Sequence, residues 1–404
     1  MADALALMSE LPGALYGMLS AMSLPALLAL MTGSLLLMVA GAYVILCQAA
    51  PLPRLSLPSE KTYRTSDRAG VAVTRQLPCW YDKWLAERHL AAGETAGETT
   101  DSGYDLNAIE PAEVALTVVV PAYNEALRIL PALEEMVEYC DRRFGRTAAA
   151  ADKTASGVVL APTTGYEILI IDDASSDGTA EVVLDYGQQH GLHDVLRVIR
   201  LARNRGKGGG VTHGFRHARG MHIVFADADG ASRFGDLDRL LEGCAMVVDA
   251  SGRGVAIGSR AHLVGSEAVV RRSALRNFLM KSFHFVLTIL TPPATSRIRD
   301  TQCGFKLFSR PALPHIVPYM HTEGWIFDIE MLMLAESAPA TPVVAHDGTV
   351  IGTSPGIKVA EVPIHWHEVD GSKMNLVQDS IRMAIGLTVL RASWMLGVYR
   401  RRLA

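Results

Sequence analysis

Two kinds of hydrophobic pattern divide this chain of 404 residues. Residues 24–46 are almost wholly apolar, within a stretch from Leu11 to Pro53 that holds no charged residue. From Val114 onward, short apolar runs of strand length alternate with segments whose apolar residues recur at helical spacing. The pattern predicts one long apolar helix near the N-terminus, followed by an α/β region.

The α/β region is predicted from its alternation of elements. Strands are expected at 116–120, 166–171, 195–201, 222–226 and 254–259, and helices at 125–139, 178–190, 211–219, 271–290 and 374–399. Ser175 or Ser176 is placed to cap the second of these helices. The succession implies a mostly parallel, Rossmann-like sheet with helices on both faces.

The apolar stretch is long enough to span a membrane, since a bilayer core needs ~20 apolar residues. A cleaved signal peptide is the alternative, but it requires a basic segment before the apolar run. Only Asp3 and Glu10 carry charge there. We therefore predict an uncleaved, single-pass anchor at 24–46. Four basic residues follow it, which places the C-terminal bulk on the cytosolic side: Arg54, Lys61, Arg64 and Arg68.

The rest of the chain divides by composition. Residues 51–113, rich in Pro, Thr, Gly and charge, are expected to be a juxtamembrane linker with a short helix near 81–90. Residues 114–310 form the α/β domain, and 311–404 a membrane-proximal region. The helices at 271–290 and 374–399 mix apolar residues with Arg and Lys, which favours amphipathic helices at a membrane interface. Insertions at 142–164 and 338–356 are expected to be loops.

Composition narrows the class of partner. The formal net charge is −4, so no global positive field favours nucleic acid. The five cysteines are scattered, and their spacing predicts neither a disulfide framework nor a zinc site. His365 and His367 stand beside Glu368, but two histidines are too few for zinc, and hydrogen bonding is expected. His213 and His217, at helical spacing, are expected to face solvent or the sheet.

The candidate chemistry lies where three predicted strands end. The first strand is followed by PAYNE at 121–125, the second by DDASSDGT at 172–179 and the fourth by DADG at 227–230. Each cluster alone is typical of an ordinary turn. Parallel strands carry their carboxyl ends to one edge of the sheet, so the clusters are expected to converge on one crevice. Asp227 and Asp229 suit a divalent ion that bridges a diphosphate.

A glycine-rich segment, RNRGKGGG at 203–210, lies between the second and third clusters. Glycines let backbone N–H groups approach a phosphate, and Arg and Lys add positive charge. The segment is not a P-loop, because Gly208 stands after Lys207 where Ser or Thr is needed. If the sheet binds a nucleotide, it is therefore expected to use carboxylates and a metal ion, Mg²⁺ or Mn²⁺.

These four motifs, in this order, resemble those of inverting family-2 glycosyltransferases, which have the GT-A fold. The likeness runs from about residue 116 to 310. Three further segments are similar to those of the dolichyl-phosphate β-glucosyltransferases within that family: RDTQCGFKLF at 299–308, EGWIFDIE at 323–330 and EVDGSK at 368–373. The resemblance implies transfer of glucose from UDP-glucose to dolichyl phosphate, for protein N-glycosylation, at the cytosolic face of the endoplasmic reticulum membrane.

The resemblance also implies roles for single residues. The uracil and ribose would be held by Pro121, Tyr123, Glu125 and Asp173, with Asp172 structural. The sugar nucleotide and the metal ion would be held by Asp227, the backbone of Ala228, and Asp229. Lys207 would fix the glycine-rich turn or contact phosphate. Further phosphate contacts would come from Arg260, Gln302 and Lys373. In the related mannosyltransferases an arginine stands six residues before that last lysine, whereas this chain has His367.

Two assignments stay open at the level of sequence. Asp328 would hold sugar hydroxyls, or it is simply an acid at a helix N-terminus. Arg271 and Arg276 would bind the anionic headgroup of the acceptor, or they belong to a solvated helix face.

The implied chemistry needs no strong base, because a phosphomonoester acceptor is mostly anionic at neutral pH. The protein has mainly to align the reactants and stabilise the leaving diphosphate. The same chemistry with GDP-mannose as donor is one alternative, and a catalytically inactive membrane scaffold is an alternative of another class. Asp227 and Asp229 favour the enzyme, because a scaffold has no use for a carboxylate pair beside a phosphate turn.

Overall fold

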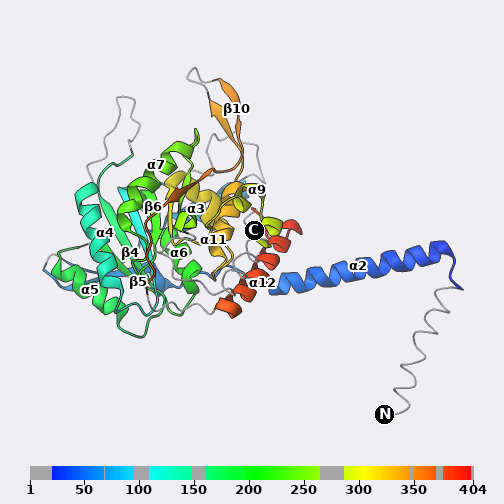
Figure 1. Cartoon of the computed structure of the whole chain (residues 1–404), viewed down its shortest axis with the longest axis horizontal. Coiled ribbons are helices and arrows are strands. Elements are labelled where there is room, and N and C mark those ends of the chain that lie inside the picture. Colours follow the sequence, from blue (N-terminus) through cyan, green and yellow to red (C-terminus); the bar gives the residue numbers. More distant parts are fainter. Residues whose placement is uncertain are drawn as a thin grey trace, which may run out of the picture. The chain divides into compact units, whose positions relative to one another are not determined.

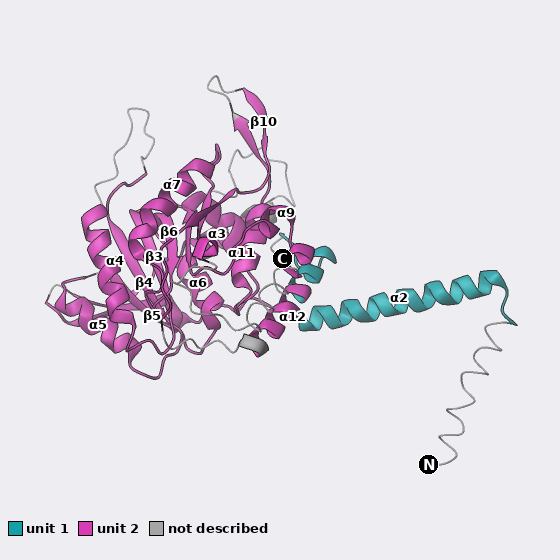
Figure 2. Cartoon of the chain, viewed as in Figure 1, with its two compact units in different colours: residues 1–50, 389–404 teal, residues 51–388 magenta. Residues whose placement is uncertain are grey.

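The computed structural model describes residues 21–67, 69–94, 109–147, 161–193, 195–263, 286–344, 349–369 and 376–401. The chain divides into two compact units (Figure 2): residues 1–50 together with 389–404, and residues 51–388. The first unit holds the N-terminal apolar helix, and the second holds the sheet.

The predicted N-terminal apolar helix is confirmed as α2, Leu24–Ala49. An 18-residue stretch of this helix has a mean hydropathy of 2.1, and among the described residues it is the one helix long and apolar enough to cross a membrane. Its apolar side chains are exposed around the helix, Leu37 by 77%. A helix that is apolar all round suits an apolar surrounding rather than water.

A nine-stranded sheet forms the centre of the second unit, in the order β11-β7-β8-β6-β3-β4-β5-β1-β2. Its strands are β1 (Thr62–Ser66), β2 (Ala72–Gln76), β3 (Val114–Ala122), β4 (Tyr166–Asp172), β5 (Leu196–Arg200), β6 (Gly220–Ala226), β7 (Val255–Ser259), β8 (Phe305–Ser309) and β11 (Val359–Pro363). β6, β3, β4 and β5 are parallel neighbours, and β11 is parallel to β7. β8 runs antiparallel to β6 and β7. The predicted, mostly parallel α/β sheet is confirmed.

Helices cover both faces of this sheet (Figure 1). α4 (Ile129–Arg143), α5 (Thr179–Gln189) and α7 (Leu237–Val247) share one core with the sheet, and α6 (Gly206–His217) packs on the other face. The remaining described helices are α3 (Trp80–Glu94), α9 (Pro293–Ser296), α10 (Leu313–Ile316), α11 (Phe327–Glu336) and α12 (Leu376–Met395), which continues into the other unit. Val118 and Val120 of β3 belong to the core shared with α4, α5 and α7. Val119, between them, lies against Gly214 of α6. Side chains of a strand alternate between faces, so β3 is buried on both.

The segment 51–113, expected as a linker, is folded over much of its length. β1 pairs antiparallel with β5 and with the edge strand β2, so it extends the sheet. In α3, Trp80 and Trp84 are buried, and the indole N–H of Trp80 donates to the carbonyl of Phe215 at 2.7 Å. The two strands are short and rich in Thr and Arg, so their hydrophobic contrast was too weak to indicate strands.

Several local elements differ from the sequence-based expectation. α4 begins at Ile129 and not at 125, because the preceding residues form a turn in which Asn124 has a φ of 52°. The expected loop at 338–356 contains a hairpin, β9 (Thr341–Val344) and β10 (Val350–Ser354). The expected helix at 271–290 lies largely outside the described residues.

The glycine-rich segment is part of a helix, and the cap of α5 differs from the one expected. α6 begins at Gly206 and not at 211. A Cβ at Gly208 would stand 2.6 Å from that of Phe327, so only glycine allows α6 and α11 to approach this closely. Gly178 precedes α5, and the Asp177 carboxylate accepts from the Thr179 N–H at 3.0 Å. Neither serine caps this helix.

Candidate functional site

Three polar clusters lie at one edge of the sheet, because β6, β3 and β4 are adjacent and parallel. Asp227 follows β6, Tyr123 follows β3 and Asp173 follows β4. The first turn of α6 lies beside them, since Gly210 is in contact range of Pro121 and Ile171. The structure therefore brings together the clusters whose convergence the sequence predicts.

Asp227 is held by Lys207 from the first turn of α6. The Lys207 Nζ lies 2.6 Å from Asp227 Oδ1. Burial acts to lower the pKa of Lys207, but attraction by Asp227 and then Asp328 outweighs it and leaves that pKa above its usual value. Lys207 is therefore a cation at neutral pH, positioned by its carboxylate partners.

Asp227 also packs against the backbone of Gly304, the glycine of the TQCGF segment. A Cβ at position 304 would stand 1.9 Å from Asp227 Oδ2, well inside contact distance. Gly304 thus makes room for the carboxylate. No role for Gly304 was predicted from the sequence, because its importance depends on a neighbour 77 positions away along the chain.

Asp229 is half-buried beside Asp227. Its Oδ1 accepts from the Ala231 N–H at 3.1 Å, which orients the carboxylate. Burial, followed by the like charge of Asp227, raises the pKa of Asp229. Two carboxylates flanking the buried Ala228 therefore form a local excess of negative charge that a cation relieves.

Asp173 links β4 to the start of α6. Its two carboxylate oxygens accept from the backbone N–H groups of Arg205 (2.6 Å) and Gly206 (2.8 Å). Burial nevertheless raises the pKa of Asp173 to about 6, against the opposing effect of those hydrogen bonds. Its neighbour Asp172 accepts from the Ser175 N–H at 3.0 Å and so closes the turn. The two adjacent acids therefore have different surroundings.

The turn after β3 is fixed by the turn after β4. The Asn124 N–H donates to Ser175 Oγ (2.9 Å), and Asn124 Oδ1 accepts from the Ser176 N–H (2.8 Å). The Glu125 carboxylate accepts from the Arg128 guanidinium at 2.7 and 2.8 Å. Tyr123 is 41% exposed. These two turns form one hydrogen-bonded unit that leaves the Tyr123 ring accessible.

Asp328 lies in the first turn of α11 and is bonded to Lys306 of β8, with both side chains buried. Burial raises the pKa of Asp328, although Lys306 and then Lys207 oppose that effect. Acidic and basic side chains therefore alternate in a chain of interacting charges: Asp227, Lys207, Asp328 and Lys306. Lys306 was not predicted as a site residue, because its one signal in the sequence is a lysine inside the apolar run of β8.

Of the residues expected to contact the acceptor, the structure describes Arg260 and Gln302. The Arg260 guanidinium forms two hydrogen bonds with the Asp300 carboxylate, at 2.7 and 2.8 Å. Gln302 is half-buried, and its Nε2 lies 3.7 Å from the sulfur of Met383. Arg271, Arg276 and Lys373 lie outside the described residues.

Within the described residues, no group of three or more His, Cys, Asp or Glu side chains is arranged to hold a metal ion. His365 bonds to Asp236 at 3.0 Å and lies beyond the end of β11, not within a strand. His213 and His217 are buried and bond to the backbone carbonyls of Glu60 and Pro78, at 2.9 and 2.6 Å. They face the folded segment 51–94 and not solvent or the sheet.

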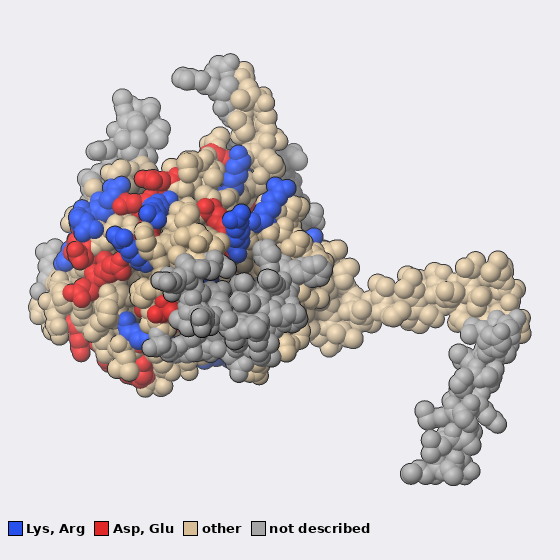
Figure 3. All heavy atoms as spheres, viewed as in Figure 1, with Lys and Arg blue, Asp and Glu red and all other residues tan. Residues whose placement is uncertain are grey.

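The visible surface of the second unit carries acidic and basic side chains intermixed (Figure 3). This distribution agrees with the small formal net charge of −4.

Comparison with known proteins shows the family of this chain. Residues 117–313 match the family described as glycosyl transferase family 2. The chain is 37% identical over 374 residues to the dolichyl-phosphate β-glucosyltransferase of Saccharomyces cerevisiae, which covers 91% of this chain and 93% of the yeast protein. It is 35% identical over 286 residues to the protein of the same name from Homo sapiens, covering 70% and 77%.

Among solved structures, the chain is similar to mannosyl-3-phosphoglycerate synthase from Rubrobacter xylanophilus. That likeness has a TM-score of 0.42 at 15% identity and covers 84% of both chains. Glucosyl-3-phosphoglycerate synthase from Mycobacterium tuberculosis gives a TM-score of 0.41 at 15% identity, covering 69% of this chain and 79% of that one.

Its similarity to these relatives and to the family model makes this protein an enzyme of the glycosyltransferase class. It belongs to glycosyl transferase family 2, in the branch formed by the dolichyl-phosphate β-glucosyltransferases.

Proposed function

We propose that the protein transfers glucose from UDP-glucose to dolichyl phosphate with inversion, giving dolichyl β-D-glucosyl phosphate and UDP. The observation that carries this proposal is the similarity, along 91% of the chain, to the yeast protein named dolichyl-phosphate β-glucosyltransferase. The site supports it, since acids and a lysine gather where ligands bind in α/β sheets, beyond the carboxyl ends of the strands.

The donor set at the strand ends fits a divalent ion such as Mg²⁺ or Mn²⁺. Asp227 and Asp229 offer hard oxygen ligands. Mg²⁺ commonly takes one or two carboxylates and completes its shell with water and substrate phosphates, so two protein ligands suffice. When bound, the ion would stabilise the charge that develops on the leaving diphosphate.

The protein's own residues would then align the reactants. We assign Asp173, with Pro121, Tyr123 and Glu125, to the uracil and ribose, and Lys207 to the diphosphate. A phosphate oxygen of the acceptor attacks the anomeric carbon as the bond from that carbon to the β-phosphate oxygen of UDP breaks. Because the acceptor is already anionic at neutral pH, no side chain has to remove a proton.

The acceptor is a lipid, and the chain offers features for working at a membrane. α2 would be a single-pass anchor in the endoplasmic reticulum, with the second unit on the cytosolic side because basic residues follow the helix. Within the second unit, α12 exposes Ile381 and Ile385, four positions apart on one helix face. These exposed apolar side chains support the proposal that α12 lies at the membrane interface.

A donor assay tests the proposed reaction. Membranes that contain the protein are given dolichyl phosphate, Mg²⁺ and labelled UDP-glucose or GDP-mannose. We expect lipid-linked glucose from UDP-glucose alone, with a β linkage by NMR of the product. Label from GDP-mannose alone would refute the donor assignment, and no product from either donor would refute the enzyme assignment.

Substitution of one proposed ligand tests the role of the carboxylate pair. Asp229→Asn should abolish transfer but leave the melting temperature close to that of the wild type, because a ligand is lost and packing is kept. Asp238→Asn, at a side chain 52% exposed, is the matched control and should retain activity. A collapsed melting temperature in Asp229→Asn would instead make this acid structural.

Removal of residues 1–48 tests the mode of membrane attachment. We expect the truncated protein to be released only in part, since the regions at 271–290 and 374–399 would still bind lipid. Complete solubility without detergent would refute an interfacial role for those two regions.

A further inference from the structure

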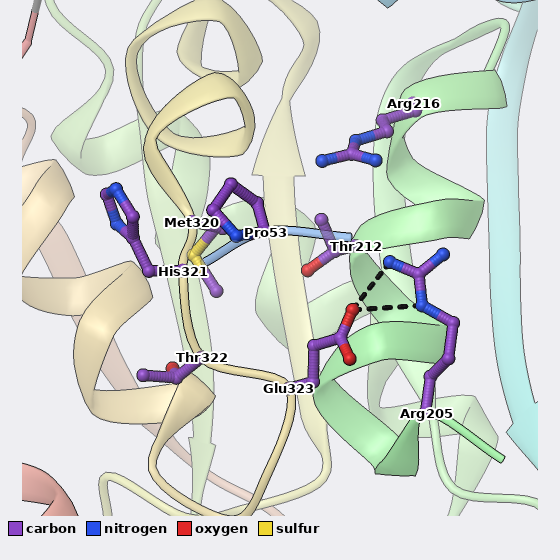
Figure 4. Close-up of a pocket in the computed structure, with 8 residues that line it drawn as sticks. All are labelled: Pro53, Arg205, Thr212, Arg216, Met320, His321, Thr322 and Glu323. Carbon is purple, nitrogen blue, oxygen red and sulfur yellow. Dashed lines mark hydrogen bonds and ion pairs between the residues drawn. The ribbon is translucent and has the colours of Figure 1, made fainter. Parts of the chain in front are cut away.

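Glu323, in the segment that precedes α11, bridges two arginines from distant parts of the chain. Its Oε1 accepts from the guanidinium of Arg205 at 2.6 and 2.9 Å, and its Oε2 lies 2.9 Å from Nε of Arg54. Figure 4 shows the Glu323 carboxylate facing Arg205, beside a small cavity that both residues line. Arg205 also donates to the carbonyl oxygen of Arg54 at 3.1 Å. Arg54, Arg205 and Glu323 therefore form one ion-pair triad.

Burial decides which contact of this triad matters most. The side chains of Arg205 and Glu323 are 3% and 14% exposed, whereas that of Arg54 is 44% exposed. A buried ion pair that loses one partner leaves an uncompensated charge, while an exposed pair contributes little to stability. The local structure therefore depends mainly on the contact between Glu323 and Arg205, and the contact with Arg54 is secondary.

The backbone of Glu323 also contacts the first turn of α6. Its carbonyl oxygen accepts from the Gly209 N–H at 3.3 Å. A Cβ at Gly206 or at Gly208 would stand 2.8 or 2.9 Å from the same oxygen, so the helix approaches this carbonyl group closely. Glu323 therefore holds the start of α6 at two points, through its own carbonyl group and through the side chain of Arg205, which immediately precedes the helix.

The segment that carries Arg54 makes further contacts with the same region. The Glu60 carboxylate accepts from the Ala202 N–H at 3.0 Å, and the Glu60 carbonyl oxygen lies 2.9 Å from Nε2 of His213. Oγ of Ser56 lies 3.2 Å from the other nitrogen of that ring. Residues 54–60 therefore contact both α6 and the loop 202–205 that precedes it.

The end of this loop holds a carboxylate of the candidate site. The N–H groups of Arg205 and Gly206 donate to the two oxygens of Asp173, at 2.6 and 2.8 Å. Gly206 has a φ of 77°, in the left-handed region that favours glycine, so the two N–H groups converge on one carboxylate only in this loop conformation. The orientation of Asp173 therefore depends on Arg205 being held in place.

We propose that Glu323 is a positioning residue for the sugar-nucleotide donor. By holding Arg205 it fixes the two N–H groups that orient Asp173, and through Arg54 it connects them to the segment that follows α2. Glu323 acts through Arg205 and not on the reacting atoms. The inference rests on the proposed function, in which Asp173 binds the uridine of UDP-glucose.

Kinetics of full-chain variants in membranes test this role. Glu323→Gln keeps the size of the side chain and removes its charge. We expect the KM for UDP-glucose to rise about tenfold, because a hydrogen bond between charged groups is lost. We expect kcat to change by less than about twofold, since the groups at the reacting atoms are intact. Glu336→Gln is the matched control, because the Glu336 carboxylate binds the N–H groups of Ala294 and Thr295 at the start of α9, and its KM should equal that of the wild type.

The wild type, assayed alongside, separates this inference from the proposed function. If the wild type transfers glucose and Glu323→Gln has an unchanged KM, the role of Glu323 is refuted and the proposed function stands. A fall in kcat at an unchanged KM would place Glu323 with the reacting groups and would also overturn its positioning role. If the wild type transfers no glucose from UDP-glucose, the proposed function fails and this inference fails with it.

Further variants test the route through Arg205 and the link to Arg54. In an Arg205→Gln background, adding Glu323→Gln should raise the KM by less than about twofold more, since both changes break the same contact. Fully additive effects would contradict a route through Arg205. Arg54→Gln, at an exposed side chain that the fold does not need, should raise the KM about two- to threefold. Arg54→Lys should restore the wild-type value, and an unchanged KM in Arg54→Gln would refute the link to the segment that follows α2.

Hydrogen–deuterium exchange gives a readout that does not depend on activity. In Glu323→Gln the amides of residues 205 and 206 should exchange faster than in the wild type, because their hydrogen bonds to Asp173 are weakened. The amides of β3 and β4 should keep their wild-type rates. Faster exchange throughout the sheet would show a merely structural role, and unchanged exchange at residues 205 and 206 would show no role. Either result would overturn the proposal.

Discussion

The Nζ of Lys207 lies 2.6 Å from Oδ1 of Asp227, so a side chain from the glycine-rich start of α6 neutralises the acid that follows β6. The two residues stand 20 positions apart in the sequence and meet because α6 leads directly into β6. The ammonium lies beside one of the two proposed ligands of the divalent ion. Lys207 and the ion would therefore interact with the same carboxylate.

Lys207→Met should strengthen metal binding to the nucleotide-free protein. Without the Lys207 ammonium, the negative charge of Asp227 is left for the metal ion. Two unit charges about 4 Å apart interact by about 4 kcal/mol at an effective dielectric constant of about 20, so repulsion between the ammonium and the ion is also removed. We expect the Mn²⁺ dissociation constant, measured by electron paramagnetic resonance, to fall about tenfold or more. An unchanged constant would mean that the ion does not use Asp227.

Gly304→Ala should inactivate the enzyme while leaving it folded. The new methyl group would stand 1.9 Å from Asp227 Oδ2, so the carboxylate has to move. A displacement of about 1 Å in a reacting group can reduce the rate about 100-fold, and we expect a loss of kcat of at least this order. Gly324→Ala, with no atom within 4 Å of the added carbon, is the control and should retain activity. Equal activity in the two variants would contradict the packing of Gly304 against Asp227.

Binding of UDP-glucose should weaken as the pH falls through about 6. Burial raises the pKa of Asp173 from 3.8 to about 6, so the carboxylate is replaced by the neutral acid below that value. UDP-glucose has no group that titrates in this range, because its phosphates are diesters. Titration calorimetry from pH 5 to 7.5 should show affinity falling up to tenfold for each pH unit below about 6.

Asp173→Asn should remove this pH step, and persistence of the step would assign it to another group. The ionisation of Asp173 affects folding stability in the opposite direction: a higher pH strengthens UDP-glucose binding but lowers the stability of the fold. A carboxyl whose folded-state pKa is raised contributes stability that is complete below 3.8 and is lost as the pH rises through about 6.

Lys306→Met should destabilise the fold strongly. It leaves the buried Asp328 carboxylate without its main partner, and breaking a buried pair costs about 3–5 kcal/mol. Urea unfolding of the second unit, followed by tryptophan fluorescence, measures this loss. Arg142→Met removes one partner of an exposed pair with Glu138 and should cost under about 1 kcal/mol. A loss for Lys306→Met as small as that would show that Asp328 is protonated in the folded protein.

Much of the fold follows from short-range patterns in the sequence. β3, β4 and β6 were predicted to within two residues at each end because each is an apolar run buried on both faces. α2 was predicted because apolar residues continue without interruption for longer than a core helix needs. The parallel order of β4, β3 and β6 then fixed which loops meet.

Other parts of the fold carried no local signal. β1 and β2 are strands because β5 offers β1 an edge for pairing, and their own Thr- and Arg-rich residues show little alternation. The start of α6 reads as a loop, since three consecutive glycines are poor helix formers. In the folded protein it is the first turn of α6, and it packs so closely against Phe327 and Glu323 that only glycine fits there. In both cases tertiary contacts outweigh local propensity.

The mostly parallel sheet, the apolar helix and the acids at the strand ends follow from the amino-acid sequence, because each depends on residues close together along the chain. The partners of those acids become known from the folded structure alone. Lys207 holds Asp227, Gly304 makes room for it, and Lys306 holds Asp328. Among the described residues, the buried Arg216 has no carboxylate partner. Charge pairing and close packing act through space, over a few ångströms between residues that lie far apart in sequence.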